Sequence, residues 1–229
     1  MKIFRKLLFF LIVFFSSTLC LAQKDSLKIE FESGKKNFEK KIYDKALINF
    51  NNIIHYDSTN AMANYYRGLI YLQKEETYEK AYNDFNKAII LGFNNAEIFY
   101  NRGFLTEFIE TSNMSYRPEI ITKALNDINK AIELDSSYIF AYYTRAKIWK
   151  DMHEKIGYNN DSACIKEIND YSIIIRLSPN DAKAYYNRAI TELELKNYDK
   201  DKVCSDFEKS LSLGLNKEWI IDIYNKNCK

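Results

Sequence analysis

The chain has 229 residues, of which 33 are basic and 31 acidic, so its formal net charge is only +2. This balance does not favour nucleic acid or an anionic membrane surface as a partner. Only two prolines and six glycines interrupt the sequence, and no low-complexity linker divides it. We therefore predict one structural unit after the N-terminal segment.

Residues 1–22 have the pattern of a secretory signal peptide. Basic residues precede an apolar run, and small residues follow it, with Ala22 before the expected cleavage site. A lipid anchor at Cys20 is the less favoured alternative, because Leu19 stands where lipoprotein signals carry a small residue. The apolar run is too short to span a bilayer, so we expect no membrane insertion after cleavage. The sequence predicts an exported protein, periplasmic or associated with the cell envelope.

Two kinds of helical segment alternate along the rest of the chain. Each first segment is rich in aromatic residues and carries one small residue: Gly34, Gly68, Gly103, Ala146 and Ala189. Each second segment has apolar residues at helical spacing and ends at a turn: residues 44–57, 79–92, 122–135, 166–179 and 201–214. The distance to the next small residue is always 22 when it is measured from Ala46, Ala81, Ala124 and Glu167 of the second segments, whereas the distance inside a pair varies from 12 to 21. This pattern predicts stacked helical hairpins whose insertions lie along one edge.

The pattern resembles the tetratricopeptide repeat family, whose period is about 34 residues. The resemblance rests on the small residue of each first helix, the alanine of the second helix and the aromatic residue four positions later, as in Ala46 and Phe50. The sequence departs from the family pattern at Glu167, Val203 and Ile128. The resemblance implies an all-α, right-handed α-solenoid over 23–215, with units at about 27–60, 61–95, 96–138, 139–181 and 182–215, followed by a C-terminal cap helix over 216–229.

The resemblance also implies a binding groove, because in this family the inner face of the first helices receives an extended peptide or a partner helix. Tyrosine rings offer amphipathic contact area for such a partner. The alternative is that the rings pack on one another between repeats. Both hold if the rings pack edge-on and leave their hydroxyls in the groove. The expected groove residues, here called the aromatic row, are Phe31, Tyr65, Leu69, Tyr100, Asn101, Phe104, Tyr143, Tyr186, Asn187 and Ile190.

Four arginines, Arg67, Arg102, Arg145 and Arg188, precede four of the small residues. Some members of the family clamp a C-terminal carboxylate with lysine, asparagine and arginine on this face. Here that set is incomplete, because aromatic residues occupy the lysine positions. We therefore expect the arginines to form ion pairs and to pack between repeats.

The third and fourth units each contain nine extra residues, near 109–117 and 151–159. We expect these insertions to project side by side from one edge, which often marks a binding edge in repeat proteins. The alternative is that the two longer hairpins only pack on each other. The residues that would offer adaptable contacts are Met114, Tyr116, Met152 and Tyr158.

Cys164, Cys204 and Cys228 remain after signal cleavage. If the last two helices run antiparallel about the turn at Gly214, Cys204 and Cys228 lie at the same height, so we predict a disulfide between them. A bond between Cys204 and Cys164 is the alternative. None of the three belongs to a CxxC pair, and the sequence predicts no metal site.

Catalytic chemistry has little support in the sequence. His55 and His153 are the two histidines, and neither has a nucleophile or metal ligand at motif spacing. We expect no catalytic residue, no cofactor and no nucleic-acid partner. The predicted function is a non-enzymatic scaffold that holds a protein or peptide through the groove or the extended hairpin edge. The alternatives are a module that binds glycan or peptidoglycan with its tyrosines, and a self-assembling structural protein of the envelope.

Overall fold

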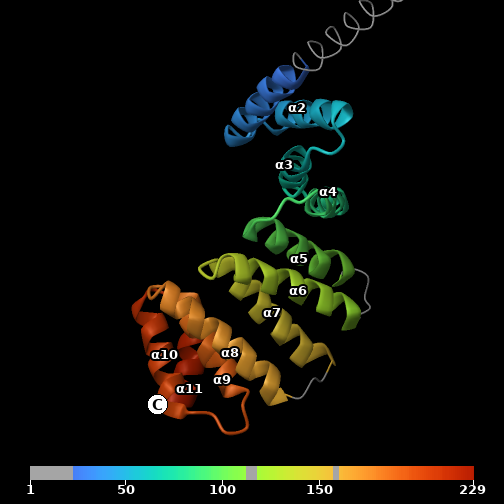
Figure 1. Ribbon diagram of the computed structural model, residues 1–229. Coiled ribbons are helices and arrows are strands. Elements are labelled where there is room, and N and C mark those ends of the chain that lie inside the picture. The colour runs from blue at the N-terminus through green and yellow to red at the C-terminus, as the bar shows by residue number, and fades with distance from the viewer. Residues whose placement is uncertain (1–22, 112–117, 157–159) are drawn as a thin grey trace, which may run out of the picture. The chain divides into compact units, whose positions relative to one another are not determined.

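The computed structural model describes residues 23–111, 118–156 and 160–229, and within these ranges the chain forms helices and turns but no strand (Figure 1). This confirms the predicted all-α fold, in which helices pack in adjacent pairs. The helices group into two compact units that divide after Phe93. The sequence predicts a single unit, but each hairpin of a repeat protein contacts only its neighbours, so a division can fall at a boundary between hairpins.

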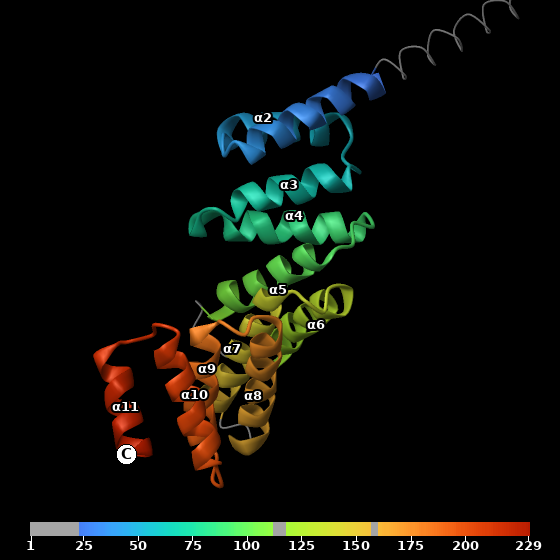
Figure 2. The same cartoon turned by 90° about the vertical axis from the view of Figure 1, so that its left-hand side faces the viewer.

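The first unit contains two helical hairpins. Residues 23–39 are helical and pack against α2 (Tyr43–Tyr56). The second hairpin consists of α3 (Ala61–Tyr71) and α4 (Tyr78–Ile90), with the short 3₁₀ turn η1 (Glu75–Thr77) between them (Figure 2). The side chain of Asn60 accepts a hydrogen bond from the Ala63 N–H at 2.9 Å and so caps the start of α3.

The second unit contains three hairpins and a final helix. Consecutive helices pack against each other, and α11 packs on α10. The hairpins are α5 (Ala96–Thr111) with α6 (Pro118–Leu134), α7 (Ile139–Ile156) with α8 (Asn160–Leu177), and α9 (Ala182–Leu193) with α10 (Lys200–Ser212), and the chain ends in α11 (Glu218–Cys228). The final helix occupies the place of the predicted cap.

Gly92 and Gly214 end α4 and α10 in the same way. Both have positive φ angles, +92° and +96°, a conformation that a side chain would strain. After Gly92, the N–H of Phe93 bonds back to the Ala88 carbonyl at 2.9 Å, and the equivalent bond follows Gly214. These turns satisfy the last carbonyls of each helix and direct the chain away from it.

Small residues stand where the first helix of a hairpin crosses the second. A Cβ atom on Gly34 would lie 2.9 Å from the Phe50 ring, and one on Gly68 would lie 2.7 Å from the Phe85 ring. Both rings are fully buried. The missing side chain on the first helix therefore makes room for a large ring on the second, which is the close crossing that the sequence pattern predicts.

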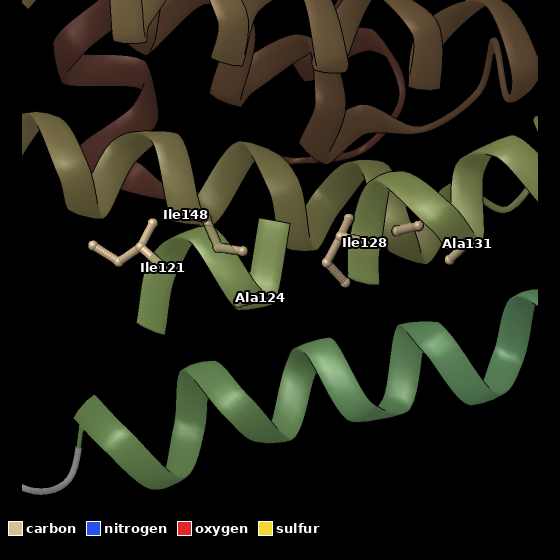
Figure 3. Packing of buried hydrophobic residues seen from close by; sticks show 6 residues of the cluster. Ile121, Ala124, Ile128, Ala131 and Ile148 are labelled. Carbon is tan, nitrogen blue, oxygen red and sulfur yellow. The ribbon is translucent and has the colours of Figure 1, made fainter. Parts of the chain in front are cut away.

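Buried aliphatic residues hold the second unit together. Figure 3 shows one cluster, in which Ile121, Ala124, Ile128 and Ala131 of α6 gather with Ile148 of α7. Ile128 stands where the family pattern has an aromatic residue, and it is fully buried. The departure is therefore accommodated by a smaller side chain in an otherwise closed core.

The extra residues of the third and fourth repeats lengthen both helices of the hairpins α5–α6 and α7–α8. The helices α5 to α8 have 16, 17, 18 and 18 residues. The helices of the flanking hairpins are shorter, with 11 and 13 residues in α3 and α4 and 12 and 13 in α9 and α10. The added length lies where the first helix of a hairpin ends and the second begins.

Candidate functional site

In the first unit, the aromatic row is largely packed against its neighbours. Tyr65 on α3 is only 5% exposed, and its ring stacks on Phe93 with centroids 4.5 Å apart. Leu69, one turn further along α3, is also buried. Phe31 lies half-buried among the rings of Phe50 and Tyr66, at 5.9 Å and 5.6 Å. In this part of the chain the rings contribute to the core, as the packing alternative predicts.

In the second unit, the row is more open at α5. Tyr100 is half-buried, and its ring meets those of Tyr138 at 5.1 Å and Phe140 at 6.4 Å. Phe104 follows one turn later and stacks on Tyr100 at 6.3 Å. Phe140 is 63% exposed, although neither it nor Tyr138 belongs to the row expected from the sequence. Tyr100 therefore supports an exposed ring that the motif does not include.

A similar arrangement lies at the other end of the unit. Tyr186 on α9 meets Trp219 of α11 edge-to-face at 5.3 Å, and Trp219 is 52% exposed. Ile190 packs with the same core cluster as Tyr186, and the neighbouring Asn187 is partly buried. Each end of the row in this unit thus carries one exposed aromatic ring beside a half-buried tyrosine.

Two buried polar groups of the row make no hydrogen bond with the described residues. They are the Asn101 side-chain nitrogen on α5 and the Tyr143 hydroxyl on α7. Burial, with a further effect of the Asp181 carboxylate, raises the pKa of Tyr143, so its hydroxyl stays neutral. The hydroxyl of Tyr143 is therefore buried rather than presented to a partner. Buried polar groups without partners are rare, and the Asn101 nitrogen is a donor without a described acceptor.

The four arginines lie outside the row and are ion-paired, as the sequence predicts. Arg67 binds Asp84 of its own hairpin through two nitrogens, at 2.8 and 2.7 Å. The corresponding pairs, with short contacts of 2.6 or 2.7 Å, are Arg102 with Asp127, Arg145 with Asp170 and Arg188 with Asp206. All four aspartates are buried. A guanidinium engaged in this way holds the two helices together and is not available to clamp a ligand carboxylate.

Three of these arginines also reach the preceding hairpin through a third nitrogen. The acceptors are Asn51 for Arg67, Asn129 for Arg145 and Ser172 for Arg188, at 2.9, 2.7 and 3.0 Å. The equivalent position in α10 is Glu208, which accepts a hydrogen bond from the Tyr224 hydroxyl of α11 at 2.9 Å. Arg67, Arg145 and Arg188 each thus join three helices, and the final helix uses a tyrosine at the equivalent position.

The insertion residues divide into described and undescribed positions. Met114, Tyr116 and Tyr158 lie outside the described residues. Met152 is described, and its half-buried side chain packs against the cluster around Ile148 of α7. In the described part of the insertions, Met152 therefore contributes to the core of the long hairpin.

Cys204 and Cys228 form a disulfide with an S–S distance of 2.04 Å, which joins α10 to α11. Cys164 is a buried free thiol. Its sulfur lies 3.0 Å from His153 Nδ1 and 3.8 Å from Glu194 Oε2. No sequence motif predicts this cluster, because His153 and Glu194 are 11 and 30 residues away from Cys164 in the chain.

Glu167 occupies the position that holds alanine in the first three hairpins, and it is almost fully buried. Its carboxylate accepts a hydrogen bond from the Thr191 hydroxyl of α9 at 2.9 Å. Burial raises the pKa of Glu167 to about 7. A carboxyl group can thus replace alanine here because a polar partner on the next helix meets it.

Comparisons with known proteins identify the fold. No protein-family model matches the sequence, and no curated protein matches it. Among solved structures, YrrB, described as a TPR protein with an unusual peptide-binding site, is similar with a TM-score of 0.65 and 19% identity, covering 86% of this chain and 90% of YrrB. The MamA protein is similar with a TM-score of 0.65 and 21% identity, covering 83% and 92%. A MamA structure from Desulfovibrio magneticus RS-1 is similar with a TM-score of 0.63 and 16% identity, covering 85% of this chain and 98% of that one.

Proposed function

We propose that this chain, which has the tetratricopeptide-repeat fold, is a non-enzymatic scaffold of the cell envelope that binds a protein or peptide. The partner contacts the aromatic row of the second unit together with the exposed rings of Phe140 and Trp219. YrrB shares the fold and is described as having a peptide-binding site, which supports this class of partner.

The exposure of Phe140 and Trp219 is the observation that carries the proposal. Large aromatic side chains dominate the energetics of protein interfaces, and a partner that covers these two rings would remove their apolar surface from water. Each ring rests on a tyrosine of the row, Tyr100 or Tyr186, so it is held in place before a partner arrives. A preorganised side chain loses less conformational entropy on binding.

The chemistry of the row favours a neutral stretch of polypeptide. The ten residues of the row carry no charge, and the arginines nearby are already paired with aspartates. An uncharged extended segment with an apolar side chain at each end fits these groups best.

Export to the envelope is part of the proposal. The pattern of residues 1–22 supports it, and so does the disulfide between Cys204 and Cys228, because such bonds persist in oxidising compartments. Among the helices that the structure describes, none is long and apolar enough to cross a membrane. Mass spectrometry of the protein from fractionated cells tests this: a chain beginning at Gln23 supports export, whereas an unprocessed cytoplasmic chain contradicts it.

Chemical crosslinking followed by affinity capture tests the binding surface. The wild type is compared with a Phe140→Ala, Trp219→Ala double variant and with a matched control, Ile165→Ala with Ile221→Ala, in which two other exposed apolar side chains are removed. We expect the wild type and the control to capture the same protein and the Phe140/Trp219 variant to lose it.

Circular dichroism establishes that all three proteins are folded. Equal capture by all three would contradict the proposed surface. If the wild type captures no protein but captures envelope glycan, and an added peptidoglycan fragment abolishes that capture, the glycan-binding alternative is favoured.

A further inference from the structure

Three helix ends meet at one edge of the second unit. His153 lies in the last turn of α7, Cys164 lies near the start of α8, and Glu194 is the residue that ends α9. Because consecutive helices of a hairpin array run antiparallel, the end of α7, the start of α8 and the end of α9 share an edge. His153 belongs to the added length of the long hairpin.

The side chains of these residues point at one another. The Cys164 sulfur lies 3.0 Å from His153 Nδ1 and 3.8 Å from Glu194 Oε2. One ligand atom from each residue lies within 4.8 Å of the other two. In a tetrahedral zinc site with bonds of about 2.0–2.3 Å, ligand atoms are roughly 3.3–3.6 Å apart. Shifts of about half an ångström to one ångström at the side-chain ends would therefore produce metal-binding geometry.

We propose that His153, Cys164 and Glu194 bind one borderline-soft divalent cation of the zinc class. A thiolate, an imidazole and a carboxylate are the ligand types that such a cation takes. Calcium and magnesium are excluded as the preferred ion, because they bind oxygen ligands. A neutral imidazole, one thiolate and one carboxylate also balance the two positive charges, which lowers the cost of burying the ion.

The surroundings of the sulfur support a cation there. Cys164 is fully buried, and the carboxylate of Glu194 lies 3.8 Å from its sulfur. A dication bound here would be neutralised by this carboxylate and would take the proton from the coordinating thiol.

Access and charge nearby are compatible with metal entry. Glu194 is exposed, so the cluster reaches the surface on the side of α9 and leaves a direction for water as a further ligand. Lys150 is the cationic group on α7 that lowers the pKa of Glu167, and its ammonium lies 3.7 Å from the carboxylate of Glu154. Its charge is thus partly balanced by a carboxylate outside the cluster.

Cobalt titration of the purified, chelator-treated full chain tests the proposal under non-reducing conditions. We expect saturable binding of one Co²⁺ per chain, with a near-ultraviolet band from thiolate-to-cobalt charge transfer that Zn²⁺ abolishes by displacement. Cys164→Ser should remove the band. His153→Gln and Glu194→Gln should weaken binding by about 100-fold or more, because even changes beside metal ligands cost roughly 10- to 100-fold.

His55→Gln is the matched control and should bind as the wild type does, since this histidine is on α2 in the first unit. Glu194→Gln changes an exposed residue, so this variant remains informative if Cys164→Ser does not fold. Cobalt binding without the thiolate band, equal affinity in the wild type and Glu194→Gln, or no saturable binding would each overturn the proposal. In those cases the sulfur–imidazole contact is only a hydrogen bond of the core.

Discussion

The long hairpins α5–α6 and α7–α8 differ from the short hairpins α3–α4 and α9–α10 in length but not in how their helices cross. All four crossings have an arginine paired with a buried aspartate. The extra residues extend both helices beyond this point, toward the turn between them. The helices of long and short hairpins therefore cross in the same way, and the turn end can lengthen and gain groups such as His153.

Breaking the crossing should produce the largest effect and should do so in both classes of hairpin. We expect Asp170→Ala in the long hairpin and Asp84→Ala in the short one each to lower the free energy of unfolding by about 3 kcal/mol, because each leaves a partly buried guanidinium without its carboxylate. Urea unfolding measures the change. Lys130→Ala, which removes an exposed ion pair with Glu133, is the control and should change stability by about 0.5 kcal/mol or less. A loss in only one class would show that the crossings are not equivalent.

A disulfide joins the short hairpin α9–α10 to the final helix α11. Replacing Cys204 and Cys228 together with serine should lower the free energy of unfolding by about 3 kcal/mol, because the bond closes a loop of 24 residues in the unfolded chain. The wild type in reductant should lose the same amount. If the oxidised wild type and the double variant unfold at the same denaturant concentration, the disulfide does not stabilise the cap.

Glu167 makes the stability of the long hairpin α7–α8 depend on pH. Its pKa is raised to about 7 from 4.5, so the folded state binds a proton more tightly than the unfolded state. The contribution of the protonated Glu167 to the free energy of unfolding is fully present below pH 4.5. The free energy of unfolding then falls by about 2–3 kcal/mol as the pH rises through 7. Glu167→Gln, which can still accept the Thr191 hydrogen bond, should therefore be more stable than the wild type at pH 8 and similar to it at pH 4.5.

Denaturant unfolding at both pH values, with a metal chelator present, measures this difference. The Val203 position of the short hairpin α9–α10 provides the contrast, because Val203 is apolar and fully buried and Val203→Ala should cost the same at both pH values. A constant difference between Glu167→Gln and the wild type would contradict the assigned titration.

The smallest expected effect concerns the closeness of the crossing in the short hairpins. Gly68→Ala places a methyl group 2.7 Å from the Phe85 ring, and overpacking costs about 1–3 kcal/mol. The better helix propensity of alanine returns about 1 kcal/mol, so we expect a net loss of about 1 kcal/mol in urea unfolding. Glu79→Ala, an exposed change on α4, serves as the control. A stability gain in Gly68→Ala would show that Phe85 moves aside freely.

The sequence predicts the repeated parts of this structure well, because they depend on local spacing. The helix pairs and the crossing at Gly68 follow from residues at helical spacing, and the arginine that recurs before four of the small residues predicts ion pairing without naming its partner. The form of the insertions does not follow, since extended helices and projecting loops have the same length in sequence. The exposure of Phe140 and the meeting of Cys164 with Glu194 depend on how three helices are phased, which no single-helix pattern reports.

The arginines also link one hairpin to the next. An arginine on the first helix of a hairpin donates a hydrogen bond to a polar side chain on the second helix of the preceding hairpin, and the acceptors are Asn51, Asn129 and Ser172. The donors and acceptors stand at equivalent positions of their helices, so the same contact recurs along the chain. In the last hairpin the equivalent position is Glu208, which accepts a hydrogen bond from the Tyr224 hydroxyl of α11. The final helix thus contacts the last hairpin through the same position that links one hairpin to the next.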